Sequence, residues 1–142
     1  MDIIHYLQVN STLEKVYPVI STPRGISSWW SLDASGHTEL GAILNLDFGP
    51  GYQWQAQVVE MVPLVEFELL LTKADLDWVN TTVGFQLTRA ENHVDVRFSH
   101  KGWSEASDHY YISCYCWAMY LRLMKRYVEH GETVEYQQRL NV

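Results

Sequence analysis

The sequence has few basic residues, and this shortage argues against two large classes of partner. Lysine and arginine together number 10, against 17 aspartates and glutamates, so the formal net charge is −7 at pH 7. A nucleic-acid surface needs clustered basic side chains that displace counterions from phosphates, and anionic lipid headgroups attract the same side chains. We therefore expect no nucleic acid among the partners and no binding to anionic membrane surfaces.

Long apolar runs and a cysteine framework are missing too. No stretch approaches the roughly 20 apolar residues of a membrane span, and the start, MDIIHYLQ, has no basic segment, so we expect no signal peptide. The two cysteines, Cys114 and Cys116, stand two residues apart in a segment with helical periodicity. They should point to different faces and stay unpaired, which favours a cytoplasmic location.

Metal and nucleophile motifs are also lacking. The six histidines are scattered, and no two of them have the i, i+4 spacing of a helical metal site. GPGY at 49–52 is a turn and no phosphate loop, because no helix is predicted after it. We find no Ser-His-Asp order and no pair of inward carboxylates, and we expect neither a metal nor a cofactor.

Aromatic residues are what the chain has in plenty, at 13% of its residues. Two of them, Trp29 and Trp30, stand side by side in TPRGISSWWS, where a short predicted helix runs out. With 142 residues, 47% of them hydrophobic, the chain is long enough for one domain with a real core. We expect a single domain over 1–142, in which 132–142 form a flexible tail.

Periodicity predicts a strand, two short helices, at least five more strands and one long helix. The capping box STLE at 11–14 starts the first helix, which Pro18 should kink or shorten, and Thr22-Pro23 starts the second. Clean alternation of apolar and polar residues indicates an antiparallel sheet with one wet face. The strands are predicted at 3–9, 42–48, 53–62, 64–72, 78–88 and 93–100, and the long helix at 104–131.

The simplest compact arrangement is an α+β fold whose curved sheet wraps around the long helix. A helix gripped in this way need not fill all the volume against the sheet, so a cavity is expected between them. The helix should bury one apolar stripe against the sheet, made of Tyr110, Cys114, Trp117, Leu121, Met124 and Val128. Three residues outside this stripe are candidates for a dimer patch: Tyr115, Met119 and Tyr120.

Both ends of the chain resemble a known superfamily. STLEKVYPVISTPRGISSWW is similar to the opening of the START-like (SRPBCC, helix-grip, Bet v allergen-like) superfamily, although Pro18 departs from its first-helix pattern. SHKGW and WAMYLRLMKRYVEHG resemble the ending of one member family, the heat-shock-protein-90 ATPase activator homologues with their bacterial stand-alone members. The matching positions are Ser11, Lys15, Val16, Tyr17, Thr22, Pro23, Trp29, Trp30, Trp117, Leu121, Lys125, Tyr127, Glu129 and Gly131.

The resemblance implies a helix-grip fold and leaves three functions open. START-like proteins include carriers of lipids and hormones, polyketide cyclases and a co-chaperone domain, and a shared fold does not transfer chemistry. We favour binding of a small, mostly hydrophobic or lipid-like molecule. The alternatives are a co-chaperone-like domain that binds a chaperone without ligand, and a cyclase-like or hydrolase-like enzyme. The chain is expected to be a monomer or a homodimer.

His100 is the sharpest polar signal, because alternation with Val96 and Phe98 turns it inward. It is either a ligand donor or general base, or a hydrogen-bonded core histidine, and we favour the core role. Of the two adjacent tryptophans, one indole should pack under the sheet edge and the other should lie at the cavity mouth. The alternative is that both indoles fill the end of the space that the curved sheet encloses. The expected cavity wall consists of Trp29, Trp30, Trp54, Phe67, Phe85, Phe98, His100, Tyr110, Tyr111, Cys114, Trp117 and Leu121.

Overall fold

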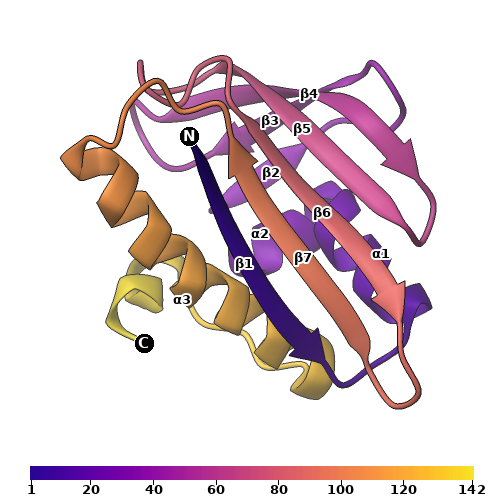
Figure 1. Ribbon diagram of the computed structural model, residues 1–142. Coiled ribbons are helices and arrows are strands. Elements are labelled where there is room, and N and C mark those ends of the chain that lie inside the picture. Colours follow the sequence, from indigo (N-terminus) through magenta and orange to yellow (C-terminus); the bar gives the residue numbers. More distant parts are fainter.

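A seven-stranded antiparallel sheet forms the framework of the computed structural model, which describes all 142 residues (Figure 1). The strand order across the sheet is β1-β7-β6-β5-β4-β3-β2, so β1 and β2 are its two edges. The elements are β1 (Asp2–Val9), α1 (Leu13–Ser21), α2 (Pro23–Trp29), β2 (Asp33–Ser35), β3 (Ile43–Asp47), β4 (Gln53–Val62), β5 (Glu66–Lys73), β6 (Thr82–Arg89), β7 (Val94–Lys101), α3 (Asp108–His130) and the 3-10 helix η1 (Tyr136–Asn141).

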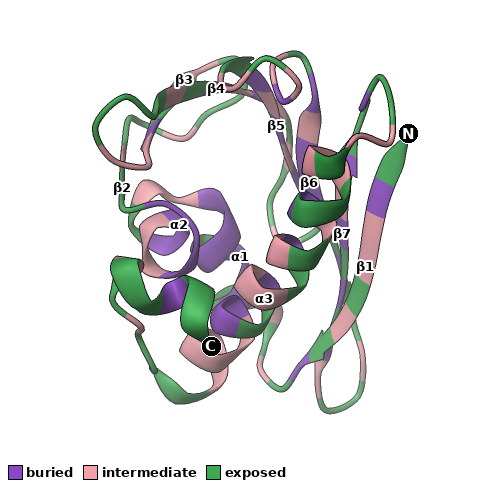
Figure 2. Ribbon diagram, turned by 90° about the vertical axis from the view of Figure 1, so that its left-hand side faces the viewer, coloured by how far each residue is buried: buried purple, intermediate pink, exposed green.

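The sheet curves around α3, and α1 and α2 close one end of the molecule (Figures 1 and 2). In β7 the side chains of Val94, Val96, Phe98 and His100 are buried, while Asp95 between them is exposed. This alternation fixes which face of the sheet meets the helix. All buried hydrophobic side chains join one cluster, and the arrangement is the helix-grip α+β fold that the sequence predicts.

The two short helices begin close to where the sequence places them. At α2 the prediction is confirmed, because Thr22 accepts a hydrogen bond from the Gly25 N–H at 3.0 Å and Pro23 holds the first turn. At α1 the expected capping box is wrong. The helix starts at Leu13, its N-cap is Thr12, and no side chain caps it. Pro18 lies inside α1 without ending it.

One strand begins well after its predicted start, and one short strand has no counterpart in the prediction. The strand expected at 78–88 starts only at Thr82. Trp78 belongs instead to a turn, in which its backbone N–H donates to the Asp75 carbonyl. Asn80 in this turn has φ of 68°, a left-handed conformation that interrupts a strand. The edge strand β2 was not predicted, since three residues are too few to show alternation.

The long helix α3 ends where expected, begins at Asp108 rather than at the predicted residue 104, and has a different rotation about its axis. Ser107 caps its first turn by accepting the Tyr110 N–H, and Gly131 ends it with φ of 66°. Of the predicted stripe, Trp117, Leu121 and Met124 are buried, whereas the other three residues are half-buried. The buried set instead includes Ser113 and Leu123. No helix is both long enough and apolar enough to cross a membrane.

The C-terminal segment 132–142, expected as a flexible tail, instead contains the 3-10 helix η1 and folds back against α2. Arg139 is 6% exposed, and its guanidinium donates to the backbone carbonyls of Ser27, Trp30 and Ser31 at 3.0 to 3.2 Å. These carbonyls lie at the end of α2, where a helix leaves acceptors unpaired and favours a positive charge. One buried arginine therefore anchors η1.

Candidate ligand cavity

A cavity of about 400 Å³ lies on one side of α3, between this helix and the β3–β4 part of the sheet. Figure 2 shows the elements around it, with α2 and α3 on one side and the β3–β4 hairpin on the other. Only three of its lining residues are neither hydrophobic nor aromatic: Asp75, His109 and Ser113. The others are Trp30, Phe48, Tyr52, Trp54, Trp78, Ile112, Cys116, Trp117, Tyr120, Tyr136 and Leu140.

Four indoles form the inner part of the cavity wall. The ring centroids of Trp54 and Trp78 are 5.1 Å apart, those of Trp78 and Trp117 are 5.7 Å apart, and those of Trp30 and Trp117 are 5.0 Å apart. Aromatic pairs at such separations pack favourably and present both ring faces and ring edges to the space between them. The wall therefore suits a flat apolar molecule.

The two adjacent tryptophans have different surroundings. The Trp29 indole is 1% exposed, donates to the Val19 carbonyl at 3.0 Å and meets Phe85 edge to face, which places it in the core. Trp30 contacts Phe48 and Trp117 on the cavity wall. One indole thus packs under the sheet and the other closes the inner end of the cavity.

The expected wall and the observed wall share Trp30, Trp54 and Trp117. The remaining nine residues of the expected wall lie elsewhere. Tyr111 is 62% exposed on the outer face of α3. Trp29, Phe67, Phe85, Phe98, His100 and Leu121 are buried in the core, and Tyr110 and Cys114 lie on the β1 side of α3.

Contacts with β1 explain the rotation of α3. The Tyr110 hydroxyl donates to the Asp2 carbonyl at 3.1 Å, and the His5 ring lies 3.3 Å from the Cys114 carbonyl. These contacts turn Tyr110 and Cys114 toward the sheet edge. The residues that face the cavity are consequently those one position before the predicted stripe, namely Ser113, Cys116 and Tyr120.

His100 is a core histidine with both ring nitrogens in use. Its Nδ1 accepts the Trp117 indole N–H at 3.0 Å, and its Nε2 lies 2.7 Å from the Thr81 hydroxyl oxygen. Burial, with a smaller effect from the charge of His109, lowers the pKa of His100 to about 3. The ring is therefore neutral at pH 7, and Nε2 carries the proton and donates to Thr81. The geometry removes His100 as a general base, because no lone pair is free.

A second histidine does reach the cavity. His109 Nδ1 lies 2.7 Å from the Asp77 carboxylate, and its ring stacks on Trp78 with centroids 6.1 Å apart. Because a carboxylate only accepts hydrogen bonds, Nδ1 is the donor and Nε2 is left without a protein partner. The sequence pattern missed this pair, since Asp77 lies in a turn and meets His109 only in the folded chain.

Three further groups of the wall, on Tyr120, Cys116 and Tyr136, are uncharged at neutral pH. Burial, together with the neighbouring Tyr136 and Cys116, raises the pKa of Tyr120 to about 12. Burial also raises the pKa of the Cys116 thiol and of Tyr136. No lysine or arginine lines the cavity, and no group of three or more histidines, cysteines or carboxylates is placed to hold a metal ion.

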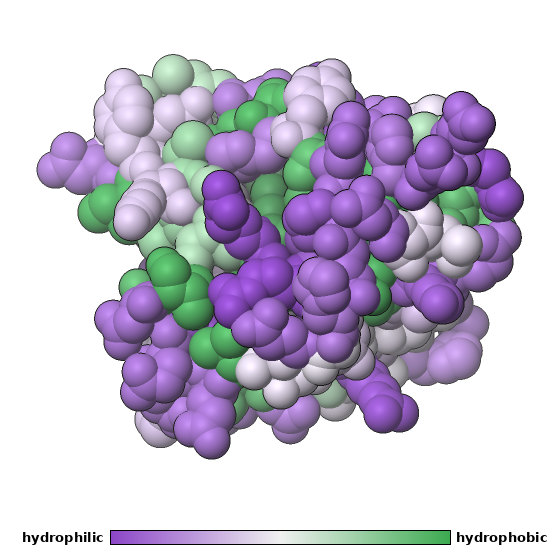
Figure 3. All heavy atoms as spheres, turned by 90° about the horizontal axis from the view of Figure 1, so that it is seen from below, coloured by the Kyte–Doolittle hydropathy of each residue, from purple (hydrophilic) through white to green (hydrophobic).

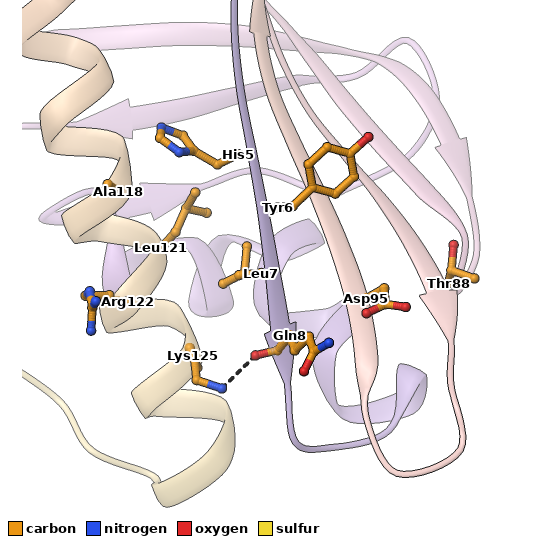
Figure 4. A pocket seen from close by; sticks show the side chains of 10 residues that line it. All are labelled: His5, Tyr6, Leu7, Gln8, Thr88, Asp95, Ala118, Leu121, Arg122 and Lys125. Atoms are coloured by element: carbon orange, nitrogen blue, oxygen red, sulfur yellow. Dashed lines mark hydrogen bonds between the residues drawn. The ribbon is translucent and has the colours of Figure 1, made fainter.

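A larger hollow, of about 890 Å³, follows the edge strand β1, and its lining residues lie on both faces of the sheet. Figure 4 shows His5 and Leu7 pointing from β1 toward α3, while Tyr6 and Asp95 point to the other face of the sheet. Lys125 bridges the gap by donating to the Gln8 carbonyl at 2.6 Å. This hollow is an open groove that wraps around a strand.

The face of the molecule seen from below in Figure 3 is mostly hydrophilic, with hydrophobic side chains in separate groups. By contrast, three exposed apolar side chains from three different segments lie on the lining of the cavity. They are Tyr52, Ile112 and Leu140, with exposed fractions of 52%, 58% and 66%.

Comparisons with known proteins agree with this fold. The family model described as Activator of Hsp90 ATPase homolog 1-like protein matches residues 10–129. The solution structure of the Aha1 dimer from Colwellia psychrerythraea is 28% identical, with a TM-score of 0.83, over 93% of this chain and 98% of that one.

More distant structures share the fold alone. A protein from Staphylococcus saprophyticus is 20% identical with a TM-score of 0.79, over 94% of this chain and 96% of that one. CalU16 from Micromonospora echinospora is 13% identical with a TM-score of 0.74, over 99% of this chain and 81% of that one. No curated protein matches the chain.

Proposed function

The chain belongs to the Activator of Hsp90 ATPase homolog 1-like family, and from this premise we propose that it binds a small, flat, mostly apolar molecule in the cavity beside α3. The observation that carries the proposal is a cavity of about 400 Å³ with four indoles on its wall, in which 11 of the 14 lining residues are hydrophobic. Binding sites for small molecules have this size and this balance of many apolar and few polar groups.

Burial of apolar surface would drive binding. A ligand about the size of an indole buries roughly 200 Å², which contributes on the order of 5 kcal/mol before the costs of association. The exposed rim formed by Tyr52, Ile112 and Leu140 extends the apolar surface toward the solvent. A ligand larger than one ring system would gain further contacts there.

The test is a pair of matched substitutions on α3. Cys116 lines the cavity, and Ala118, two residues later, lines the open groove beside β1. Cys116→Phe should weaken binding of 2-isopropenylnaphthalene at least tenfold, because the new ring fills the site, while Ala118→Phe should bind like the wild type. Calorimetric titration gives the affinities. No binding to the wild type, or equal binding by both variants, would contradict the proposal.

A second candidate is association through the surface of the protein. The observation that favours it is the 28% identity to a protein whose solution structure is described as a dimer. On the outer face of α3, Tyr111 and Tyr115 are 62% and 72% exposed, which is unusual for large aromatic side chains one turn apart. We propose that a second copy of the chain covers them. Light scattering on the wild type and on a Tyr111→Ser, Tyr115→Ser variant tests this, since only the wild type should dimerise.

The cyclase-like or hydrolase-like alternative with His100 as the base is not proposed, because both nitrogens of that ring are hydrogen-bonded within the core.

The unpaired cysteines support the proposal of a cytoplasmic location.

A further inference from the structure

A chain of hydrogen bonds with a fixed direction runs through the core as far as the backbone of Trp78, a residue of the cavity wall. It starts at the Trp117 indole, which donates to His100, and continues from the neutral His100 ring to the Thr81 hydroxyl. The Thr81 hydroxyl in turn donates to the Trp78 carbonyl, so its single proton is used. In a separate hydrogen bond, the indole of Trp78 donates to Ser113 Oγ at 3.3 Å.

The Ser113 hydroxyl has one proton that no protein group accepts. It accepts the Trp78 indole N–H and donates to no protein atom, not even to the carbonyl one turn earlier on α3. The residue is only 3% exposed, yet it lines the cavity. A hydroxyl has a single proton, and a buried donor without an acceptor costs about 1–3 kcal/mol. An acceptor on a bound molecule would remove this cost.

We propose that the cavity selects flat apolar molecules that carry a carbonyl oxygen, and that the Ser113 hydroxyl donates to this oxygen. The inference rests on the proposed function, because it assigns a chemical class to the same site. It predicts the position of the oxygen as well, at the α3 side of the cavity, next to Trp78.

The charges around the cavity favour a neutral carbonyl over a carboxylate. No lysine or arginine lines the wall, and Asp75 on the wall would repel an anion. His109 is paired with Asp77, so a positive charge on its ring would already be balanced. An aryl ketone, an aryl aldehyde or a quinone meets these conditions, whereas a fatty acid does not.

The experiment compares two molecules of nearly the same shape. 2-Acetylnaphthalene has a carbonyl oxygen where 2-isopropenylnaphthalene has a CH₂ group. In the wild type both should bind. Ser113→Ala should weaken the ketone about fivefold or more, which is the effect of one lost hydrogen bond, and leave the hydrocarbon within about twofold.

Cys116→Ala is the matched control. It also removes one side-chain heavy atom from the same wall, but no hydroxyl donor. It should change the affinities of the ketone and the hydrocarbon by the same factor. Thermal unfolding of each variant checks that loss of the Trp78 partner has not unfolded the protein.

The carbonyl stretching band of bound 2-acetylnaphthalene provides an independent readout. In the wild type it should lie at lower frequency than in an alkane solvent, and in Ser113→Ala it should return to the alkane value. Should neither molecule bind the wild type, the proposed function fails. If both bind and Ser113→Ala leaves their affinity ratio and the band unchanged, the binding site stands and the role of Ser113 is refuted.

Discussion

The buried imidazole of His100 makes a quantitative prediction about stability and pH. Burial and, to a lesser degree, the charge of His109 lower its pKa in the folded chain to about 3, from an ordinary value of 6.5. The unfolded chain therefore binds a proton more readily than the folded chain between these two pH values. This contribution to stability is fully present above pH 6.5 and is lost progressively as the pH falls toward 3.

The size of the loss follows from the two pKa values. One pH unit corresponds to about 1.4 kcal/mol for each proton taken up, so the folded state should lose on the order of 2 kcal/mol at pH 5 and 3 kcal/mol at pH 4. His100→Asn keeps an acceptor for the Trp117 indole and cannot be protonated. The variant is expected to be less stable at pH 8 and to lose less stability on acidification.

Urea denaturation at pH 8, 6, 5 and 4 measures this difference. The other five histidines and all carboxylates are present in both proteins, so their effects cancel in the comparison. His37→Asn is the control, because its side chain is 87% exposed and the variant should follow the wild type at every pH. Parallel curves for the wild type and His100→Asn would refute the account, because they would mean that His100 titrates as a solvated histidine.

Three further changes test the core and the cavity wall. Trp117→Ala removes a side chain that is 1% exposed and should cost about 3–5 kcal/mol in chemical denaturation; a loss below about 1 kcal/mol would mean that this face of α3 is solvated. Gly25→Ala should destabilise by about 1–3 kcal/mol or more, since a Cβ there would lie 2.3 Å from the Pro18 carbonyl oxygen, and unchanged stability would show that α1 and α2 are farther apart. Arg139→Met should release η1 from α2 and speed dissociation of 2-isopropenylnaphthalene in stopped-flow fluorescence, whereas an unchanged rate would show that η1 does not retain the ligand.

The fold could be predicted from the sequence because its signals are local. Alternation along 53–62 and 93–100 identifies strands, and the capping residues Ser107 and Gly131 mark the ends of α3. Each of these features depends on neighbours within a few positions. The resemblance at both ends of the chain then selects one arrangement of the predicted elements.

The cavity could be predicted only in part, because turns and long-range contacts build it. Phe48, Tyr52 and Trp78 reach the wall from segments at or beyond strand ends, where periodicity gives no direction. The rotation of α3 depends on contacts with β1, whose residues lie more than a hundred positions earlier. Alternation does identify the residues on the concave face of the sheet. Most of these residues form the core beneath α3 and do not line the cavity.

The six tryptophan indole N–H groups allow the most direct test of ligand binding in this cavity. Trp30, Trp54, Trp78 and Trp117 line the wall, whereas Trp29 and Trp103 are buried outside it. In two-dimensional ¹H–¹⁵N spectra, titration with 2-isopropenylnaphthalene should shift the four wall signals strongly and leave those of Trp29 and Trp103 nearly unchanged. Binding that leaves the four wall signals in place, or that shifts mainly the backbone amides of β1 beside the open groove, would contradict the account.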